Sequence, residues 1–383
     1  MNSVPPSLRS LALADITPED VDWMIREGET LVELKADIPK DGIGPTISSF
    51  ANTLGGWLVL GVEDKDRSVV GWMPNGRADI VDYLRQRLRE EVDPMPPFAA
   101  REMEIRGGQV GVVRIYESMD TPHIIRRTGA VYLREPGGKR PIREHGELIE
   151  LARRGEDAEA RARARLHEMP VVSEVLRTPD TGRVENETRA VRWIARAAPL
   201  TVSPVTRDWP LTRRAADWCS DYVDCALRHR APYERVGPRI DPYGRAVVAY
   251  VDQDVSIGTR DRSLLVADAG GVFGAELDKG IEIGDRPSIL VEQMLGESIK
   301  PLARALAAIL TEAEAWGRAV VDLWCLFPGD EPIAGPHRQP FARHLHAAGE
   351  ITTPATEGDV DALASAWHRE LQRSIGIVKF EDE

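Results

Sequence analysis

Three stretches near the start of the chain place apolar residues at helical spacing, with charged residues between them. They predict helices over residues 18–27, 45–54 and 79–91. Proline stands at the first helical position of the first two stretches, where its missing N–H costs little. Gly55 and Gly56 follow the second stretch, and glycine readily takes the left-handed conformation that ends a helix. The pattern therefore predicts short helices with well-defined ends.

Shorter apolar runs between these helices predict the strands of one sheet. The expected strands cover residues 30–35, 57–62, 99–105, 110–116 and 130–134. Residues 57–62 lack a strict alternation of apolar and polar side chains, so we expect that strand to be buried on both faces. Helices and strands in this order predict an α/β (α+β) fold with a mixed sheet and flanking helices.

The chain has 383 residues, which is long for one domain and suits two. We expect an N-terminal domain over residues 18–155, closed by a helix over 144–153. A charged connecting helix is expected over 156–169, and an accessory α+β domain over 170–383. In the last region the pattern predicts helices over 186–197, 211–227, 288–326 and 359–371. Strands are expected there over 245–252 and 263–267.

The composition narrows the class of protein. A formal net charge of -13 argues against a general nucleic-acid binder, because phosphate contacts need Lys and Arg. The charge is uneven, however, since residues 123–154 hold twice as many basic as acidic side chains. This segment is either a positive face on an acidic protein or an ordinary solvated surface.

The same composition indicates the compartment. No apolar run approaches the ~20 residues that cross a bilayer, and the N-terminus lacks a signal-peptide pattern. The three cysteines form no CxxC pair, which is typical of reduced thiols. We therefore expect a cytoplasmic protein with no membrane partner.

Residues 29–72 carry the candidate chemistry. Glu33 and Lys35 share one face of their expected strand, because side chains alternate with period two. Glu63 and Asp64 come directly after the next strand. Carboxylates and a lysine at the ends of neighbouring elements can hold a divalent metal against a phosphate. The alternative interpretation is a salt bridge that ties the strand to its neighbour.

Four separated blocks in roughly residues 18–155 resemble the Schlafen AlbA-type domain. The blocks are, in order, Glu33-Leu34-Lys35, Phe50-Ala51-Asn52-Thr53-Leu54-Gly55-Gly56, Gly61-Val62-Glu63-Asp64, and Thr121-Pro122-His123 with Ala130-Val131-Tyr132-Leu133-Arg134. They stand where the family has Glu-Phe-Lys, a helix ending in AFANT-GG, Gly-Val-Asp-Asp and a later strand. This order identifies the N-terminal part as a member of the family.

The resemblance implies nucleic acid, RNA or DNA, as the partner. Some Schlafen proteins are metal-dependent endoribonucleases acting on tRNA and rRNA, while other family members are described as DNA-binding regulators. By this resemblance the catalytic residues are Glu29, Glu33, Lys35, Glu63 and Asp64. The ligands of Mg²⁺ or Mn²⁺ are then Glu29, Glu33, Glu63 and Asp64.

Basic residues after His123 are the expected phosphate contacts, since arginine forks suit phosphate oxygens. They are Arg126, Arg127, Arg134, Lys139, Arg140 and Arg143. Three functions stay open: a metal-dependent endoribonuclease in defence or stress response, a DNA-binding transcriptional regulator, and a protein-interaction module. A homodimer is expected, because one AlbA-type lobe supplies half of the two-lobed cleft of larger Schlafens.

Overall fold

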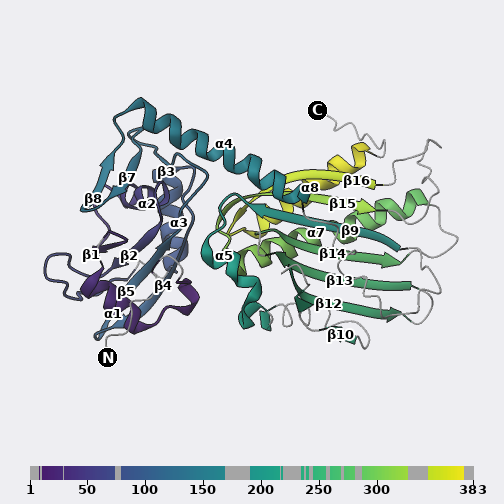
Figure 1. Ribbon diagram of the computed structural model, residues 1–383, viewed down its shortest axis with the longest axis horizontal. Helices are drawn as coiled ribbons and strands as arrows, with labels where there is room; N and C mark the ends of the chain where they lie inside the picture. The colour runs from purple at the N-terminus through teal and green to yellow at the C-terminus, as the bar shows by residue number, and fades with distance from the viewer. Residues whose placement is uncertain are drawn as a thin grey trace. The chain divides into compact units, whose positions relative to one another are not determined.

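The structure is a computed structural model, and it divides into two compact units (Figure 1). One unit comprises Met1–Ala160 with Leu200–Val205, and the other Arg161–Pro199 with Thr206–Glu383. The residues described below are 8, 11–28, 30–73, 79–168, 190–215, 217–218, 234–236, 239–240, 245–255, 259–268, 271–280, 287–326 and 344–374.

The N-terminal unit is built on a four-stranded mixed sheet with strand order β1-β2-β5-β4. The strands are β1 (Val32–Lys35), β2 (Gly56–Leu60), β4 (Phe98–Ile105) and β5 (Gly108–Ile115). β1 and β2 run parallel, whereas the β2–β5 and β4–β5 pairs are antiparallel. The parallel pair brings the carboxyl ends of β1 and β2 to the same edge of the sheet.

Helices cover both faces of this sheet. The helices are α1 (Pro18–Glu27), α2 (Gly44–Ala51) and α3 (Ile80–Glu91), after a short 3-10 turn at Leu13–Asp15. Trp57 and Val59 of β2 pack in one core cluster with residues of α1, while Leu58 and Leu60 pack in another with residues of α2 and α3. The expected burial of this strand on both faces is therefore confirmed.

Two small strand pairs and a long helix complete the N-terminal part. The pairs are β3 (Val92–Asp93) with β6 (Ile124–Ile125), and β7 (Tyr132–Glu135) with β8 (Gly138–Pro141). The long helix, α4, runs without a break from His145 to Glu168, where the sequence predicted two shorter helices. Gly155 lies inside this helix. A Cβ at this position would lie 3.0 Å from the Thr121 carbonyl oxygen, and this close approach favours glycine.

The second unit holds a separate antiparallel sheet with strand order β10-β12-β13-β14-β9-β15-β16, and β11 pairs with β12. Its strands are β9 (Ala190–Pro199), β10 (Glu234–Val236), β11 (Arg239–Ile240), β12 (Arg245–Val255), β13 (Thr259–Asp268), β14 (Phe273–Gly280), β15 (Gly317–Leu326) and β16 (His344–Thr353). Its helical elements include α5 (Pro204–Asp208, which begins in the other unit), a 3-10 turn at Trp209–Leu211, α7 (Pro287–Glu312) and α8 (Glu357–Ser374).

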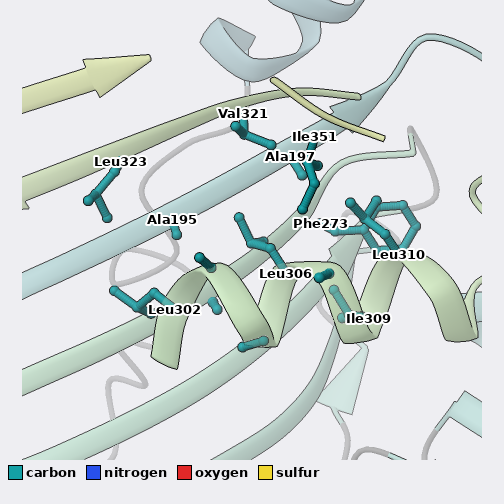
Figure 2. Packing of buried hydrophobic residues seen from close by; sticks show 14 of the residues in the cluster. Ala195, Ala197, Phe273, Leu302, Leu306, Ile309, Leu310, Val321, Leu323 and Ile351 are labelled. Carbon is teal, nitrogen blue, oxygen red and sulfur yellow. The ribbon is translucent and has the colours of Figure 1, made fainter. Parts of the chain in front are cut away.

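The core of this unit lies between the sheet and helix α7. Leu302, Leu306 and Leu310 of the helix pack with Ala195, Phe273 and Val321 of the strands (Figure 2). Trp367 of α8 is fully buried in the same cluster.

Two predicted helices of the second unit are wrong in whole or part. Residues 190–199 form strand β9, whose odd-numbered residues from 193 to 197 enter the core. The helix expected over 288–326 ends at Glu312, and 317–326 form strand β15. Glu314 and Gly317 take positive φ values of 51° and 94°, which break the helix between the two elements. Residues 219–227 of a further expected helix lie outside the described residues.

The expected fold class is confirmed: a mixed sheet with flanking helices in the N-terminal unit, and a separate unit of helices and a sheet. Within the described part of the chain, none of the helices has the length and apolar character needed to cross a membrane.

Candidate functional site

Glu33 lies among three cations beside the sheet of the N-terminal unit. Alternate residues of β1 are buried, which leaves Glu33 and Lys35 on the same, opposite face. Lys35 Nζ is 2.6 Å from Glu33 Oε1, and Arg134 Nη1 is 2.7 Å from Oε2. Lys139 is close enough for its charge to interact with all three groups. We call Glu33, Lys35, Arg134 and Lys139 the Glu33 cluster.

The β7–β8 hairpin supplies two of these cations. Arg134 and Lys139 stand directly opposite each other in its register. The turn between the strands uses Gly137 and Gly138 at φ 94° and 147°, a region that L-residues rarely adopt. Lys139 Nζ then donates to Thr46 Oγ1 in the first turn of α2, at 3.2 Å. The hairpin thus brings a sequence-distant ammonium within electrostatic reach of the β1 carboxylate.

Arg134 also has a structural role. Its Nε donates to the Thr30 carbonyl at 3.0 Å and its Nη2 to the Val32 carbonyl at 3.3 Å. Its guanidinium lies 4.5 Å from the centroid of the Phe50 ring, and its side chain is only 7% exposed. Since β1 is an edge strand, Arg134 satisfies backbone groups that would otherwise lack partners. It holds the carboxylate of Glu33 in place from the buried side.

The cluster carries more positive than negative charge. Burial alone would raise the pKa of Glu33, but hydrogen bonds from Lys35 and Arg134 and their charges hold it below its usual value. Burial lowers the pKa of Lys139, and the attraction of Glu33 and Asp41 only partly opposes this because Lys35 and Arg134 repel the same ammonium. Within the cluster three cations lie around one carboxylate, and Lys139 is the one that has no ion pair with a described residue.

Asn52, at the end of α2, holds the segments around the cluster together. Its amide nitrogen donates to the carbonyls of His123 and Tyr132 at 3.2 and 3.0 Å, and its Oδ1 accepts from the His123 N–H at 2.9 Å. Gly55 and Gly56 follow, and a Cβ on Gly56 would lie 2.4 Å from the Phe50 ring. The block that resembles AFANT-GG is therefore a structural joint between helix, strand and hairpin.

His123 is completely buried in this joint. Its Nδ1 lies 2.7 Å from the Pro94 carbonyl oxygen, while Nε2 has no hydrogen-bond partner among the described residues. Burial lowers the pKa of His123 to about 4. The ring is neutral at pH 7, so Nδ1 donates to Pro94 and Nε2 keeps its lone pair.

The predicted metal ligands Glu63 and Asp64 form no metal-binding group of three with Glu33. Glu63 and Asp64 lie in an exposed turn after β2, at the sheet edge where β1 also ends. The turn is tied to β1 through the Lys35 carbonyl, which accepts from the N–H groups of Gly61 and Val62. Glu29 lies outside the described residues. Among the residues described, no group of three or more His, Cys, Asp or Glu side chains is placed to hold a metal ion.

The described donor set does not fit a magnesium or manganese ion. Such ions take several hard oxygen ligands, usually carboxylates and waters. Both oxygens of Glu33 are already hydrogen-bonded to cations, which would repel an incoming dication. The metal therefore stays a prediction.

The other predicted phosphate contacts fall into two groups. Arg126 pairs with Asp93, and Arg140 pairs with both Glu135 and Glu147. The exposed residues Arg127 and Arg143 have no ion pair with any described residue. Thr46 was not predicted, because its contact with Lys139 spans 93 positions and no local pattern marks it.

Fold and cluster define the N-terminal unit as an α/β domain with a carboxylate–lysine pair on a parallel edge strand. Residues 27–143 match the family model described as Schlafen, AlbA_2, so this segment is a Schlafen AlbA_2 domain. The match includes the whole Glu33 cluster and confirms the resemblance noted in the sequence. A comparison with curated proteins gave no match to the chain.

Proposed function

We propose that the AlbA_2 domain binds nucleic acid by phosphate contacts at the Glu33 cluster, with Lys139 as the principal contact. The observation that carries the proposal is the charge imbalance, with three cations around Glu33 and with Asp41 as a further carboxylate that attracts Lys139. The family match supports nucleic acid as the ligand. The acidic charge of the whole chain is no obstacle, since phosphate contacts depend on local cations.

Lys139 suits this role for an electrostatic reason. Its ammonium is partly desolvated, and Glu33 is shared with two other cations. An incoming phosphate supplies the missing counter-charge and accepts charge-assisted hydrogen bonds. Lys139 therefore gains more from a phosphate than a cation that is already paired.

Arg127 and Arg143 are proposed as further contacts with the nucleic-acid backbone. Both are exposed and have no ion pair with the described residues. Arg140 is expected to contribute less, because Glu135 and Glu147 already neutralise it. Each such contact adds affinity without reading base sequence.

The test is a salt titration of binding with Lys139→Gln and Arg140→Gln. Labelled tRNA, single-stranded DNA and duplex DNA are titrated with the full chain in EDTA. On duplex DNA, Lys139→Gln should make the slope of log K against log salt shallower by about 0.9, the loss of one phosphate contact. Arg140→Gln, a change of the same charge one residue away, should alter it less. Equal slopes for wild type and Lys139→Gln would refute the contact.

Metal-dependent cleavage of tRNA or other structured RNA is the alternative proposal. It draws on the shared edge of β1 and β2, where Glu33 and the turn of Glu63 and Asp64 lie. Cutting in Mn²⁺ that disappears in EDTA and in Glu33→Gln would support it. Binding of duplex DNA alone, without cutting, would favour a regulator, and binding of none of the substrates would leave the interaction module.

The homodimer and the cytoplasmic location stay predictions. Sedimentation of the full chain at micromolar concentration tests the first, and a monomer throughout would contradict it. Fractionation of cells that produce the protein tests the second.

A further inference from the structure

We infer that Glu33 acts as a built-in competitor for phosphate, whose carboxylate occupies the cation cluster and weakens nucleic-acid binding. The inference rests on the proposed function and adds how that site is regulated. It assigns Glu33 the effect opposite to that of a metal ligand, because removing its charge should strengthen binding.

The geometry of Glu33 is that of a bound anion. Its two oxygens accept from two different cations, at 2.6 Å from Lys35 and 2.7 Å from Arg134. Phosphate oxygens make the same kind of charge-assisted contacts with lysine and arginine. Lys139 lies within electrostatic reach of the same carboxylate. Glu33 therefore holds the position at which the cations would converge on a ligand.

The two directly bound cations differ in how freely they can turn to a ligand. Arg134 is 7% exposed and also bonds the carbonyls of Thr30 and Val32, so it stays in place without Glu33. Lys35 is 28% exposed, and among the described residues its only ion pair is with Glu33. The side chain released by loss of the Glu33 charge is therefore Lys35.

Releasing Lys35 has a measurable consequence. A lysine that is neutralised in the free protein contributes little to counterion release when phosphate binds. Without its carboxylate partner it counts as a full additional contact. The slope of log K against log salt should then steepen by about 0.9 on duplex DNA, or by about 0.7 on single strands.

The experiment compares Glu33→Gln with Glu104→Gln in the full chain, in EDTA, over a range of salt concentrations. Glu104 is an exposed carboxylate on β4 without an ion pair to any described residue. Its substitution therefore removes the same charge as Glu33→Gln, but outside the cluster. Glu33→Gln should bind about five- to tenfold more tightly at ~0.1 M salt and show the steeper slope. Glu104→Gln should change affinity little and leave the slope unaltered.

Lys35→Gln keeps the inference testable if Glu33→Gln does not fold. Because Glu33 already neutralises Lys35, this variant should bind with nearly the wild-type slope. In the Glu33→Gln background the same change should remove the whole gain, which completes a double-mutant cycle.

The outcomes separate this inference from the proposed function. Wild type that binds no nucleic acid refutes the proposed function. Wild-type binding that Glu33→Gln leaves unchanged or weakens overturns the competitor role alone. A full unit of slope lost in Lys35→Gln alone overturns it as well.

Discussion

Each of the two units holds a carboxylate paired with cations on its sheet, but the net charge of the two groups differs. In the second unit Arg196 and Asp322 face each other on β9 and β15, with Nε–Oδ1 at 2.9 Å and Nη2–Oδ2 at 2.5 Å. Their side chains are only 8% and 7% exposed, and Trp324 Nε1 also donates to Asp322. In the Glu33 cluster one carboxylate serves three cations, and Lys35 reaches solvent.

This difference shows which ionic group is suited to bind a ligand. The Arg196–Asp322 pair is neutral, matched in geometry and desolvated, so an incoming anion would gain no free cation there. The Glu33 cluster keeps uncompensated positive charge close to solvent. Burial and charge balance, rather than the presence of an ion pair, therefore distinguish a structural contact from a candidate site.

The largest expected effect comes from breaking the buried pair of the second unit. Asp322→Ala leaves Arg196 buried without its carboxylate, and such changes cost about 3–5 kcal/mol of folding stability. The free energy of opening can be measured by hydrogen exchange in peptides from β9 and β15, so that the stability of the second unit is determined separately from that of the first.

The control for this change is Arg318→Gln, which removes a cation from the same sheet. Arg318 lies 3.3 Å from Glu350, and both side chains are partly exposed. Its loss should cost less than half as much as that of Asp322. A cost below about 1 kcal/mol for Asp322→Ala would contradict the structural role given to the pair.

The second largest expected effect is a loss of stability in acid, which should be greater in the N-terminal unit than in the second unit. The pKa of His123 is about 4 in the folded protein, below the ordinary histidine value of 6.5, so between these values the unfolded N-terminal unit binds a proton that the folded unit does not. Stability from this group is complete above pH 6.5 and falls as the pH drops toward 4. The loss amounts to roughly 3 kcal/mol at the acid end.

Hydrogen exchange of the N-terminal unit between pH 6.5 and 4 measures this loss, after correction for the intrinsic exchange rate. Residue 123 of His123→Gln cannot titrate, so the stability of this variant should fall much less over that range, with a remaining loss near pH 4 from carboxylates such as Glu33. In the second unit His346 also has a pKa lowered by burial, but its side chain is 39% exposed and its effect should be small. Equal slopes in wild type and His123→Gln would contradict the assignment.

The fold of the N-terminal unit was predicted well because residues next to each helix and strand mark where it begins and ends. Pro18 stands at the first position of α1, and Gly55 turns the chain at φ 68° after α2, as the sequence indicated. The second unit was harder, because the alanine-rich β9 looks helical until its neighbours are known. Packing of Ala195 and Ala197 against the core overrides their helical preference.

The candidate site was predictable only in part. The pairing of Glu33 with Lys35 follows from their spacing on one strand, and the sequence offered this salt bridge as an alternative to metal binding. The buried position of Arg134 was not predictable, because it depends on hydrogen bonds to backbone carbonyls at an edge strand about 100 residues away in the sequence. The same holds for the contact between Lys139 and Thr46.

The smallest expected effect returns to the Glu33 cluster and completes the contrast with Asp322. Glu33→Gln should lower the stability of the N-terminal unit by only about 1 kcal/mol, because Arg134 keeps its carbonyl partners and water can solvate Lys35. Hydrogen exchange in peptides from β1 and β2 gives this value, with Glu104→Gln as reference. A loss as large as that in Asp322→Ala would mean that Glu33 is there to hold the fold together. A small loss accompanied by tighter nucleic-acid binding would mean that the carboxylate tunes a ligand site.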